Sequence, residues 1–181
     1  TEKKIKTVTY VGSFYKGKGV ELIIDIARNL SKLNFNLYGE LNKDFYDIPK
    51  NVTLHGYVNY KNVPDILKKS DILLLPSAKL QFGRSSSVNI ANYNSPLKMF
   101  DYLAAGKILV STRLDGVCEV LRHNYNSLIV KEYDTKLWVK CLNNILGPIS
   151  GLLFSEAVGA PNAGATCERK MSPSKVTTPK S

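Results

Sequence analysis

The side chains best suited to chemistry lie near the N-terminus, in a glycine-rich segment between a short apolar run and a helical pattern. Gly12, Gly17 and Gly19 surround Lys18 within this segment, residues 12–19. Glycines let the backbone approach an anion closely, and the start of a helix offers unpaired amides and the positive end of a dipole. Together with the charge of Lys18, the segment predicts an anion-binding loop. A tight turn that carries a solvated lysine is the alternative.

The same segment has to be compared with the phosphate loop of nucleoside triphosphatases. Gly12, Gly17 and Lys18 satisfy the GxxxxGK spacing, but Gly19 stands where that motif has the Ser or Thr that holds magnesium. An acidic residue should also end a second apolar strand, whereas Asp71 begins such a run. A triphosphatase is therefore the weaker interpretation, and it predicts magnesium-dependent hydrolysis by this chain alone.

A second group of candidate residues begins at Ser95. Ser95 and Pro96 are typical of a helix start, because serine caps unpaired amides and proline fits the first helical position. The free amides of such a start would face the carboxyl edge of a sheet, where a diphosphate or a ribose could bind. Asp101, one or two turns into the helix, is placed to accept hydrogen bonds from both ribose hydroxyls. A surface ion pair between Lys98 and Asp101 is the alternative.

The polar stretch between these two groups, residues 78–94, contributes one more candidate. Arg84 could bind a phosphate through two parallel hydrogen bonds, and the serines at 85–87 could donate others. A loop without any ligand role is an equally supported alternative.

These residues need a scaffold that brings distant segments to one edge. From Thr7 to Leu146, short apolar runs alternate with helical patterns, which is typical of repeated βα units and a parallel sheet. The runs at 72–75 and 108–110 are continuously apolar, so helices should cover both of their faces. The predicted fold class is therefore α/β, a doubly wound, Rossmann-like parallel sheet of about six strands. Ligands of such sheets bind beyond the carboxyl ends of the strands.

The element boundaries follow from the same patterns. Strands are expected at Thr7–Val11, Asn36–Tyr38, Val52–His55, Asp71–Leu75, Ile108–Ser111 and Ser127–Val130. Helices are expected at Gly19–Leu33, Pro64–Lys69, Pro96–Ala105, Val117–Arg122 and Thr135–Leu146.

The composition changes abruptly after Leu146. Residues 147–181 are rich in Gly, Ala, Ser, Thr and Pro and show no sustained periodicity. Such a segment buries too little apolar surface to offset the entropy lost on ordering. We therefore predict a folded domain over residues 1–146 and a disordered or non-native tail over residues 147–181.

The formal net charge of +10 suits a nucleic acid, a diphosphate ligand or an anionic membrane surface. The lysines are scattered singly without an RNA-reading aromatic motif, so no nucleic-acid partner is expected. No run of about 18 apolar residues occurs, which predicts a cytoplasmic protein, with peripheral association at the inner face of a membrane as a further possibility. Cys118, Cys141 and Cys167 are widely spaced without a CxxC pattern, so we expect reduced thiols and no metal.

Several segments, in order, resemble the C-terminal, donor-binding domain of family 4 glycosyltransferases, which have the two-domain GT-B architecture. The correspondence covers Val8 to about Val130, and its motifs are more specific together than any one is alone. They are Tyr10–Phe14 with Lys18–Ile23, then Asn51–Val58, Val63–Leu67, Ser70–Ser77 and Ser95–Lys107. The resemblance implies that the sheet is one half of a GT-B fold.

Three positions depart from the family pattern. Ser13 stands where the family has arginine, Tyr93 where it has the first of two glutamates, and Asp101 where it has the second. Because the first glutamate usually faces the donor sugar, Tyr93 leaves the sugar side open. A degenerate transferase domain that acts as a binding or interaction module is therefore kept as an alternative.

The resemblance implies a glycosyltransferase that binds a nucleotide-diphosphate sugar and transfers a hexosyl group to an acceptor hydroxyl with retention of configuration. It implies no cofactor and no metal, and it places the acceptor site in an N-terminal domain outside this chain, so this chain alone is expected to be inactive. Catalytic residues are not identified. The residues expected to bind the donor nucleotide and diphosphate are Gly12, Ser13, Lys18, Gly19, Arg84, Ser95, Leu97, Lys98 and Asp101.

Overall fold

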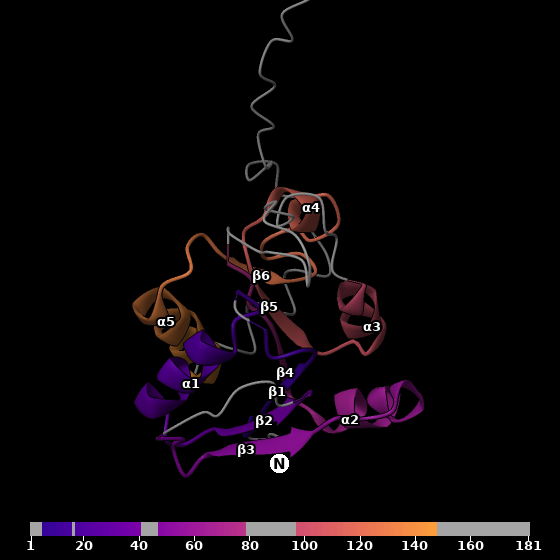
Figure 1. Cartoon of the computed structure of the whole chain (residues 1–181). Helices are drawn as coiled ribbons and strands as arrows, with labels where there is room; N and C mark the ends of the chain where they lie inside the picture. Colours follow the sequence, from indigo (N-terminus) through magenta and orange to yellow (C-terminus); the bar gives the residue numbers. More distant parts are fainter. Residues whose placement is uncertain (1–4, 16, 41–46, 79–96, 148–181) are drawn as a thin grey trace, which may run out of the picture.

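The computed structural model describes residues 5–15, 17–40, 47–78 and 97–147. Within these ranges six strands form one sheet with parallel pairings, in the order β3-β2-β1-β4-β5-β6 (Figure 1). The strands are β1 (Thr7–Val11), β2 (Asn34–Tyr38), β3 (Val52–Gly56), β4 (Ile72–Leu75), β5 (Ile108–Thr112) and β6 (Leu128–Val130). The helices are α1 (Val20–Asn29), the 3₁₀ helix η1 (Tyr60–Asn62), α2 (Val63–Lys69), α3 (Lys98–Ala104), α4 (Asp115–Cys118) and α5 (Thr135–Leu146).

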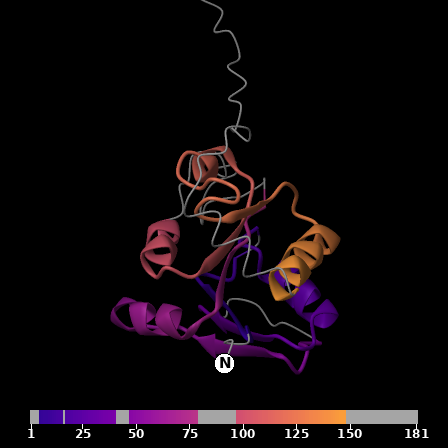
Figure 2. The same ribbon diagram turned by 180° about the vertical axis from the view of Figure 1, so that it is seen from behind.

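Alternate residues of the inner strand β4 face two separate cores. Ile72 and Leu74 belong to a cluster with α1 and α5, whereas Leu73 and Leu75 belong to a cluster with α2, α3 and α4. In the two opposite views, α1 and α5 lie on one flank of the sheet and α2 and α3 on the other (Figure 1, Figure 2). All of β4 is buried, which explains its continuous apolar run. The predicted α/β, doubly wound, Rossmann-like sheet is confirmed.

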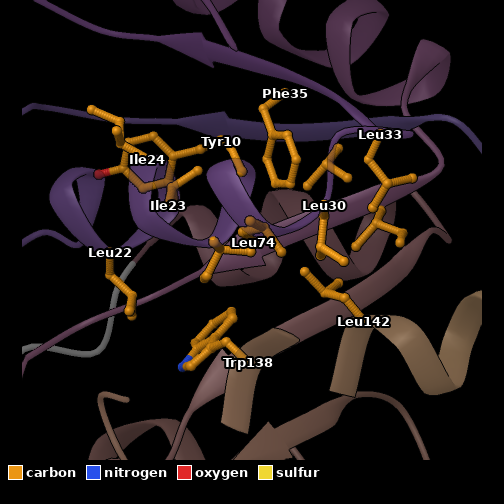
Figure 3. Close-up of a cluster of buried hydrophobic side chains, with 14 of the residues drawn as sticks. Tyr10, Leu22, Ile23, Ile24, Leu30, Leu33, Phe35, Leu74, Trp138 and Leu142 are labelled. Atoms are coloured by element: carbon orange, nitrogen blue, oxygen red, sulfur yellow. The ribbon is translucent and has the colours of Figure 1, made fainter. Parts of the chain in front are cut away.

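The larger core lies between the sheet and the pair α1 and α5. Figure 3 shows Trp138 and Leu142 of α5 below the apolar side chains of α1, with Phe35 and Leu74 of the sheet nearby. Five apolar residues of α1 and its C-cap are all buried, because an i, i+3, i+4 spacing puts them on a single stripe. They are Val20, Ile23, Ile24, Ala27 and Leu30. This packing fixes α1, and with it the loop that leads into it.

The end of α1 differs from the prediction. The helix ends at Asn29 rather than Leu33, because Leu30 leaves the helical conformation with φ −127° and ψ 60°. The side-chain amide of Asn51, which precedes β3, donates to the carbonyls of Ala27, Leu30 and Leu33 at 3.0, 3.1 and 3.0 Å. The carbonyls of Ala27 and Leu30 also accept from the amides of Leu30 and Leu33, so the Asn51 amide adds a hydrogen-bond donor from another segment to the end of the helix, a long-range contact that no local pattern indicates. Similarly, α4 spans Asp115–Cys118, so it begins two residues before the predicted Val117–Arg122 and overlaps that range only at Val117 and Cys118.

The strand order places a topological switch between β1 and β4. From β1 the chain proceeds to β2 and β3 on one side, and then returns to β4, β5 and β6 on the other. Connections after β1 and β4 leave in opposite directions, which opens a crevice beyond the carboxyl ends of these two strands. The glycine-rich segment 12–19 follows β1, so it lies at this crevice as predicted.

The strands β2 and β3 alternate instead of being buried throughout. Phe35 and Leu37 are buried, whereas Asn36 and Tyr38 are partly exposed. His55 of β3 stacks on Tyr38 with ring centroids 4.2 Å apart and hydrogen-bonds to the Asn36 side chain at 2.8 Å. These three side chains, Asn36, Tyr38 and His55, form a polar and aromatic surface that we name the β2–β3 face.

Three further predictions concern membrane-spanning helices, the cysteines and the C-terminal tail. No helix among the described residues combines the length and the apolar character needed to cross a bilayer. Cys118 and Cys141 are thiols, as predicted. Cys167 and the tail at 148–181 lie outside the described residues, so the division into a domain at 1–146 and a tail at 147–181 stays a prediction.

The Asn51 cap can be tested by a substitution that keeps the side chain's shape. Asn51→Asp should lower the free energy of unfolding by about 3 kcal/mol, because a carboxylate replaces the amide donor and faces three carbonyl oxygens. Urea denaturation followed by circular dichroism measures the change. Asn59→Asp is the matched control, since Asn59 accepts a hydrogen bond from the Lys61 amide and aspartate can do the same. Equal stability of the two variants would contradict the assigned role.

Candidate functional site

The loop after β1 is shaped by glycines that bring backbones close together. Gly19 caps α1 in the left-handed region with φ 94°, and a Cβ on it would lie 2.6 Å from the Pro76 Cβ. The Gly12 amide donates to the Tyr38 carbonyl at 2.8 Å, which anchors the loop to β2. Lys18, which directly precedes Gly19, is partly buried. The predicted loop residues Gly12, Ser13, Lys18 and Gly19 are therefore gathered at the carboxyl end of β1.

The loop after β4 meets the loop after β1 directly. The Ala78 amide donates to the Gly17 carbonyl at 3.0 Å, and Pro76 packs against Gly19. The Ser77 amide donates to the Thr112 hydroxyl at 3.0 Å, which extends the contact to β5. Three strand ends are joined at the switch point in this way. The contacts that Gly17 and Pro76 make between these loops were not predicted from the sequence.

Between β1 and β4 the pairing ends before the strands do. The paired residues are Val8 with Ile72 and Thr9 with Leu73. The Val11 amide donates instead to the Tyr102 hydroxyl at 2.8 Å, and that hydroxyl donates to the Val11 carbonyl at 3.3 Å. A tyrosine of α3 thus replaces β4 as the partner of the last residue of β1, at the point where the pairing of β1 with β4 has ended.

Lys98, at the start of α3, reaches across the end of β1. Its Nζ donates to the Tyr10 hydroxyl at 3.1 Å and lies 4.2 Å from the centroid of the Tyr10 ring. A Cβ on Gly12 would collide with this ammonium group. Gly12 therefore provides the space through which Lys98 passes, and the predicted site residues Lys98 and Gly12 are in contact.

The electrostatics of the crevice are dominated by two lysines. Burial, together with the positive charge of Lys18, lowers the pKa of Lys98 from its usual value to about 7. Burial also lowers the pKa of Lys18. Two ammonium groups that repel each other in a partly desolvated place gain from an anion between them. The arrangement is suited to binding a polyanion such as a diphosphate.

Asp101 has a different partner from the one weighed in the sequence analysis. Its Oδ1 accepts a hydrogen bond from the Tyr60 hydroxyl at 2.8 Å, and this bond with the carboxylate raises the pKa of Tyr60. The Lys98 ammonium points to Tyr10 instead of Asp101. Among the described residues, the alternative ion pair between Lys98 and Asp101 is therefore wrong, because the lysine is drawn across the strand end. The ribose-binding role of Asp101 stays a prediction.

The start of α3 is described from Leu97 onward. Leu97 is 82% exposed and its carbonyl accepts from the Phe100 amide at 3.1 Å, while α3 itself begins at Lys98. Ser95 and Arg84 lie outside the described residues, so their predicted contacts stay predictions. In the described part of the chain no cluster of three or more His, Cys, Asp or Glu residues could hold a metal ion.

Sequence reasoning missed three tyrosines that shape the crevice, Tyr10, Tyr60 and Tyr102. Tyr10 and Tyr102 are fully buried and lie at positions that a core pattern would fill with any large apolar residue. The available signal was their hydroxyl group, since a buried tyrosine needs a hydrogen-bond partner. Which partner it finds is decided by tertiary contacts.

Similarity to known proteins supports the resemblance found in the sequence. The sequence model of the family described as Glycosyl transferases group 1 matches residues 5–147. An uncharacterized glycosyltransferase of Methanocaldococcus jannaschii is 26% identical over 130 residues, which are 68% of this chain and 33% of that protein. The chain spans 24% and 33% of the length of two curated relatives that it matches.

Solved structures share the fold at low identity. HepE of Anabaena, crystallised with UDP-glucose, superposes with a TM-score of 0.65 at 14% identity, over 84% of this chain and 42% of HepE. The C-terminal domain of the group 1 glycosyl transferase LpcC from Francisella tularensis has a TM-score of 0.63 at 16% identity, over 84% of this chain and 80% of that domain. The likeness to an isolated C-terminal domain agrees with the six-stranded Rossmann-like sheet described above.

The contact between Gly19 and Pro76 can be tested by adding one methyl group. Gly19→Ala should lower the free energy of unfolding by about 3 kcal/mol, because it combines left-handed strain with a collision against Pro76. Gly106→Ala is the matched control, since Gly106 has φ 62° and nothing within 4 Å of an added Cβ. It should cost only about 1 kcal/mol. Thermal unfolding of both variants gives the comparison, and equal losses would contradict the close approach of the two loops.

Proposed function

The chain belongs to the glycosyl transferases group 1 family, and on this premise we propose that the crevice between β1 and β4 binds the nucleotide diphosphate of a sugar donor. The observation that carries the proposal is the pair Lys18 and Lys98, held together where the loops after β1 and β4 meet. HepE, which shares this fold, was crystallised with UDP-glucose, and that supports the same class of ligand here.

The chemistry of sugar transfer needs stabilisation of the leaving diphosphate. Negative charge develops on its oxygens as the bond to the sugar breaks, and preorganised positive groups lower the barrier. Lys18 and Lys98 supply two charges, and the first turn of α1 supplies amides that have no partner within the helix. In this account Gly12, Ser13 and Gly19 bring backbone close to the phosphates. Arg84, Ser95 and the amides near Leu97 complete the predicted set.

Asp101 is proposed to accept hydrogen bonds from the ribose hydroxyls. The Tyr60 hydroxyl bond to Oδ1 limits the directions that the carboxylate can take, while the second oxygen remains for a ligand. Aspartate and the family's glutamate differ by one methylene group, so the ribose must lie closer to α3 or be reached through water.

The whole protein is proposed to transfer a hexosyl group from the donor to an acceptor hydroxyl with retention of configuration. The acceptor site is assigned to a further, N-terminal domain, in keeping with the share of its relatives that this chain covers. The reaction in this proposal requires neither a cofactor nor a metal. The proposed location is cytoplasmic, with peripheral contact to an anionic membrane surface that the net charge of +10 would favour.

The triphosphatase alternative loses support from the position of Asp71. Asp71 Oδ2 accepts from the Lys6 and Thr7 amides, both at 3.0 Å, at the amino end of β1. Its carboxylate is thus on the edge of the sheet opposite to Lys18 and cannot serve a magnesium ion there. A degenerate domain that only binds a partner remains the second candidate, on the ground of Ser13 and Tyr93; robust sugar transfer by the full-length protein would eliminate it.

Calorimetric titration of the chain with UDP-glucose, ADP-glucose and GDP-glucose tests the site. We expect a dissociation constant in the millimolar range for at least one of them, and a loss of about tenfold in Lys18→Ala, because one charge-assisted contact to the diphosphate disappears. Lys61→Ala, on the exposed η1, is the control and should bind as the wild type does. No binding of any of the three donors, or equal binding by Lys18→Ala, would contradict the proposal.

The low pKa of Lys98 predicts how the affinity varies with pH. Its amine is mostly charged below about pH 7 and loses its proton as the pH rises through that value, while a bound diphosphate favours the charged form. Affinity for a nucleotide sugar, whose diphosphate stays fully ionised, should therefore be highest below pH 7 and fall above it. Lys98→Met should bind more weakly and lose this pH dependence. An identical pH profile in wild type and Lys98→Met would show that Lys98 does not meet the ligand.

A further inference from the structure

Tyr10 is a core residue with a polar connection to the crevice. Its ring is fully buried in the cluster with α1 and α5 and packs against Phe14, with centroids 6.2 Å apart (Figure 3). Its hydroxyl oxygen contacts two groups outside this cluster. They are the Ser13 carbonyl at 3.0 Å and the Lys98 ammonium at 3.1 Å. A ring that only filled the core would need neither contact.

The direction of these hydrogen bonds is fixed by the hydroxyl's single proton. That proton is donated to the Ser13 carbonyl, so the lone pairs of the Tyr10 oxygen face Lys98 and accept from it. The ring face adds a second attraction, because the Lys98 Nζ lies 4.2 Å from its centroid. Both interactions favour the charged ammonium group over the neutral amine. They oppose burial and the repulsion from Lys18, which act the other way.

The surroundings keep the Tyr10 hydroxyl protonated. Burial raises its pKa well above the usual value, and interactions with Tyr102 of α3, Tyr133 after β6 and Glu21 of α1 add to the increase. Lys98 faces Lys18 from the loop after β1, whereas Asp101 on its own helix is bonded to Tyr60. The hydroxyl is thus a neutral hydrogen-bonding group at every pH at which Lys98 titrates.

We propose that Tyr10 is a positioning residue of the anion site: its hydroxyl holds the Lys98 ammonium beside Gly12 and ties it to the loop backbone at Ser13. Lys98 comes from α3, on one flank of the sheet, while Tyr10 packs on the other flank, so this contact makes the lysine cross the end of β1. The inference rests on the proposed function, because a positioned ammonium group matters for binding only if the crevice takes an anion.

The test is Tyr10→Phe in the full chain, which keeps the ring and removes only the hydroxyl. With UDP-glucose as the probe, we expect about tenfold weaker binding and a pH profile that falls at lower pH than in the wild type, because the charged form of Lys98 loses an acceptor. In the Lys98→Met background the same substitution should have no further effect on affinity. Tyr125→Phe, an exposed tyrosine in the turn before β6, is the matched control and should change neither quantity.

A second variant covers the case in which Tyr10→Phe unfolds. Gly12→Ala leaves both partners intact but puts a methyl group where the Lys98 ammonium lies, so it should give the same weaker binding and the same shifted profile. A loss of affinity that is equal with and without Lys98, or an unshifted pH profile, would overturn the positioning role. Absence of binding by the wild type would overturn the proposed function together with this inference, whereas wild-type-like binding by Tyr10→Phe would overturn this inference alone.

Discussion

The crevice depends on how the last residue of β1 finds its hydrogen-bond partners. Had β4 continued to pair with β1, the backbone of Val11 would be satisfied within the sheet and the two strand ends would be closed. Instead, the Tyr102 hydroxyl forms hydrogen bonds with both the amide and the carbonyl of Val11. Buried backbone groups cannot be left unpaired, so this one hydroxyl allows the strands to separate without a large cost. The space gained is the space in which Lys98 crosses to Tyr10.

In this arrangement hydrophobic packing brings two positive charges together, although the charges repel each other. The two hydrophobic cores hold α1 and α3 rigidly against opposite flanks of the sheet, and this rigidity forces Lys18 and Lys98 into a partly desolvated place near each other. The Tyr10 hydroxyl and ring stabilise the ammonium group of Lys98 in that place. An anion bound near the two lysines offsets their mutual repulsion.

Much of the fold was predictable because its signals are local. Continuous apolar runs such as Ile72–Leu75 indicated buried parallel strands, and the helical pattern after Gly19 indicated the helix that packs against the sheet. The glycines and Lys18 could be assigned to the loop after β1 for the same reason. The rest depends on contacts between distant segments: Asn51 capping α1, Tyr102 replacing β4, and Lys98 turning to Tyr10 rather than to Asp101. Spacing within a helix suggested the Asp101 pair, and only the position of β1 shows why it does not form.

Where the ligand binds is the central claim, and residue-resolved NMR titration of the chain with UDP-glucose tests it most directly. The account predicts that the largest amide shifts occur at Gly12, Gly19 and Lys98, with a matching change at the Lys98 ammonium group. Shifts centred on the β2–β3 face, with its Tyr38 and His55 stack, would contradict it by placing the nucleotide on a different surface.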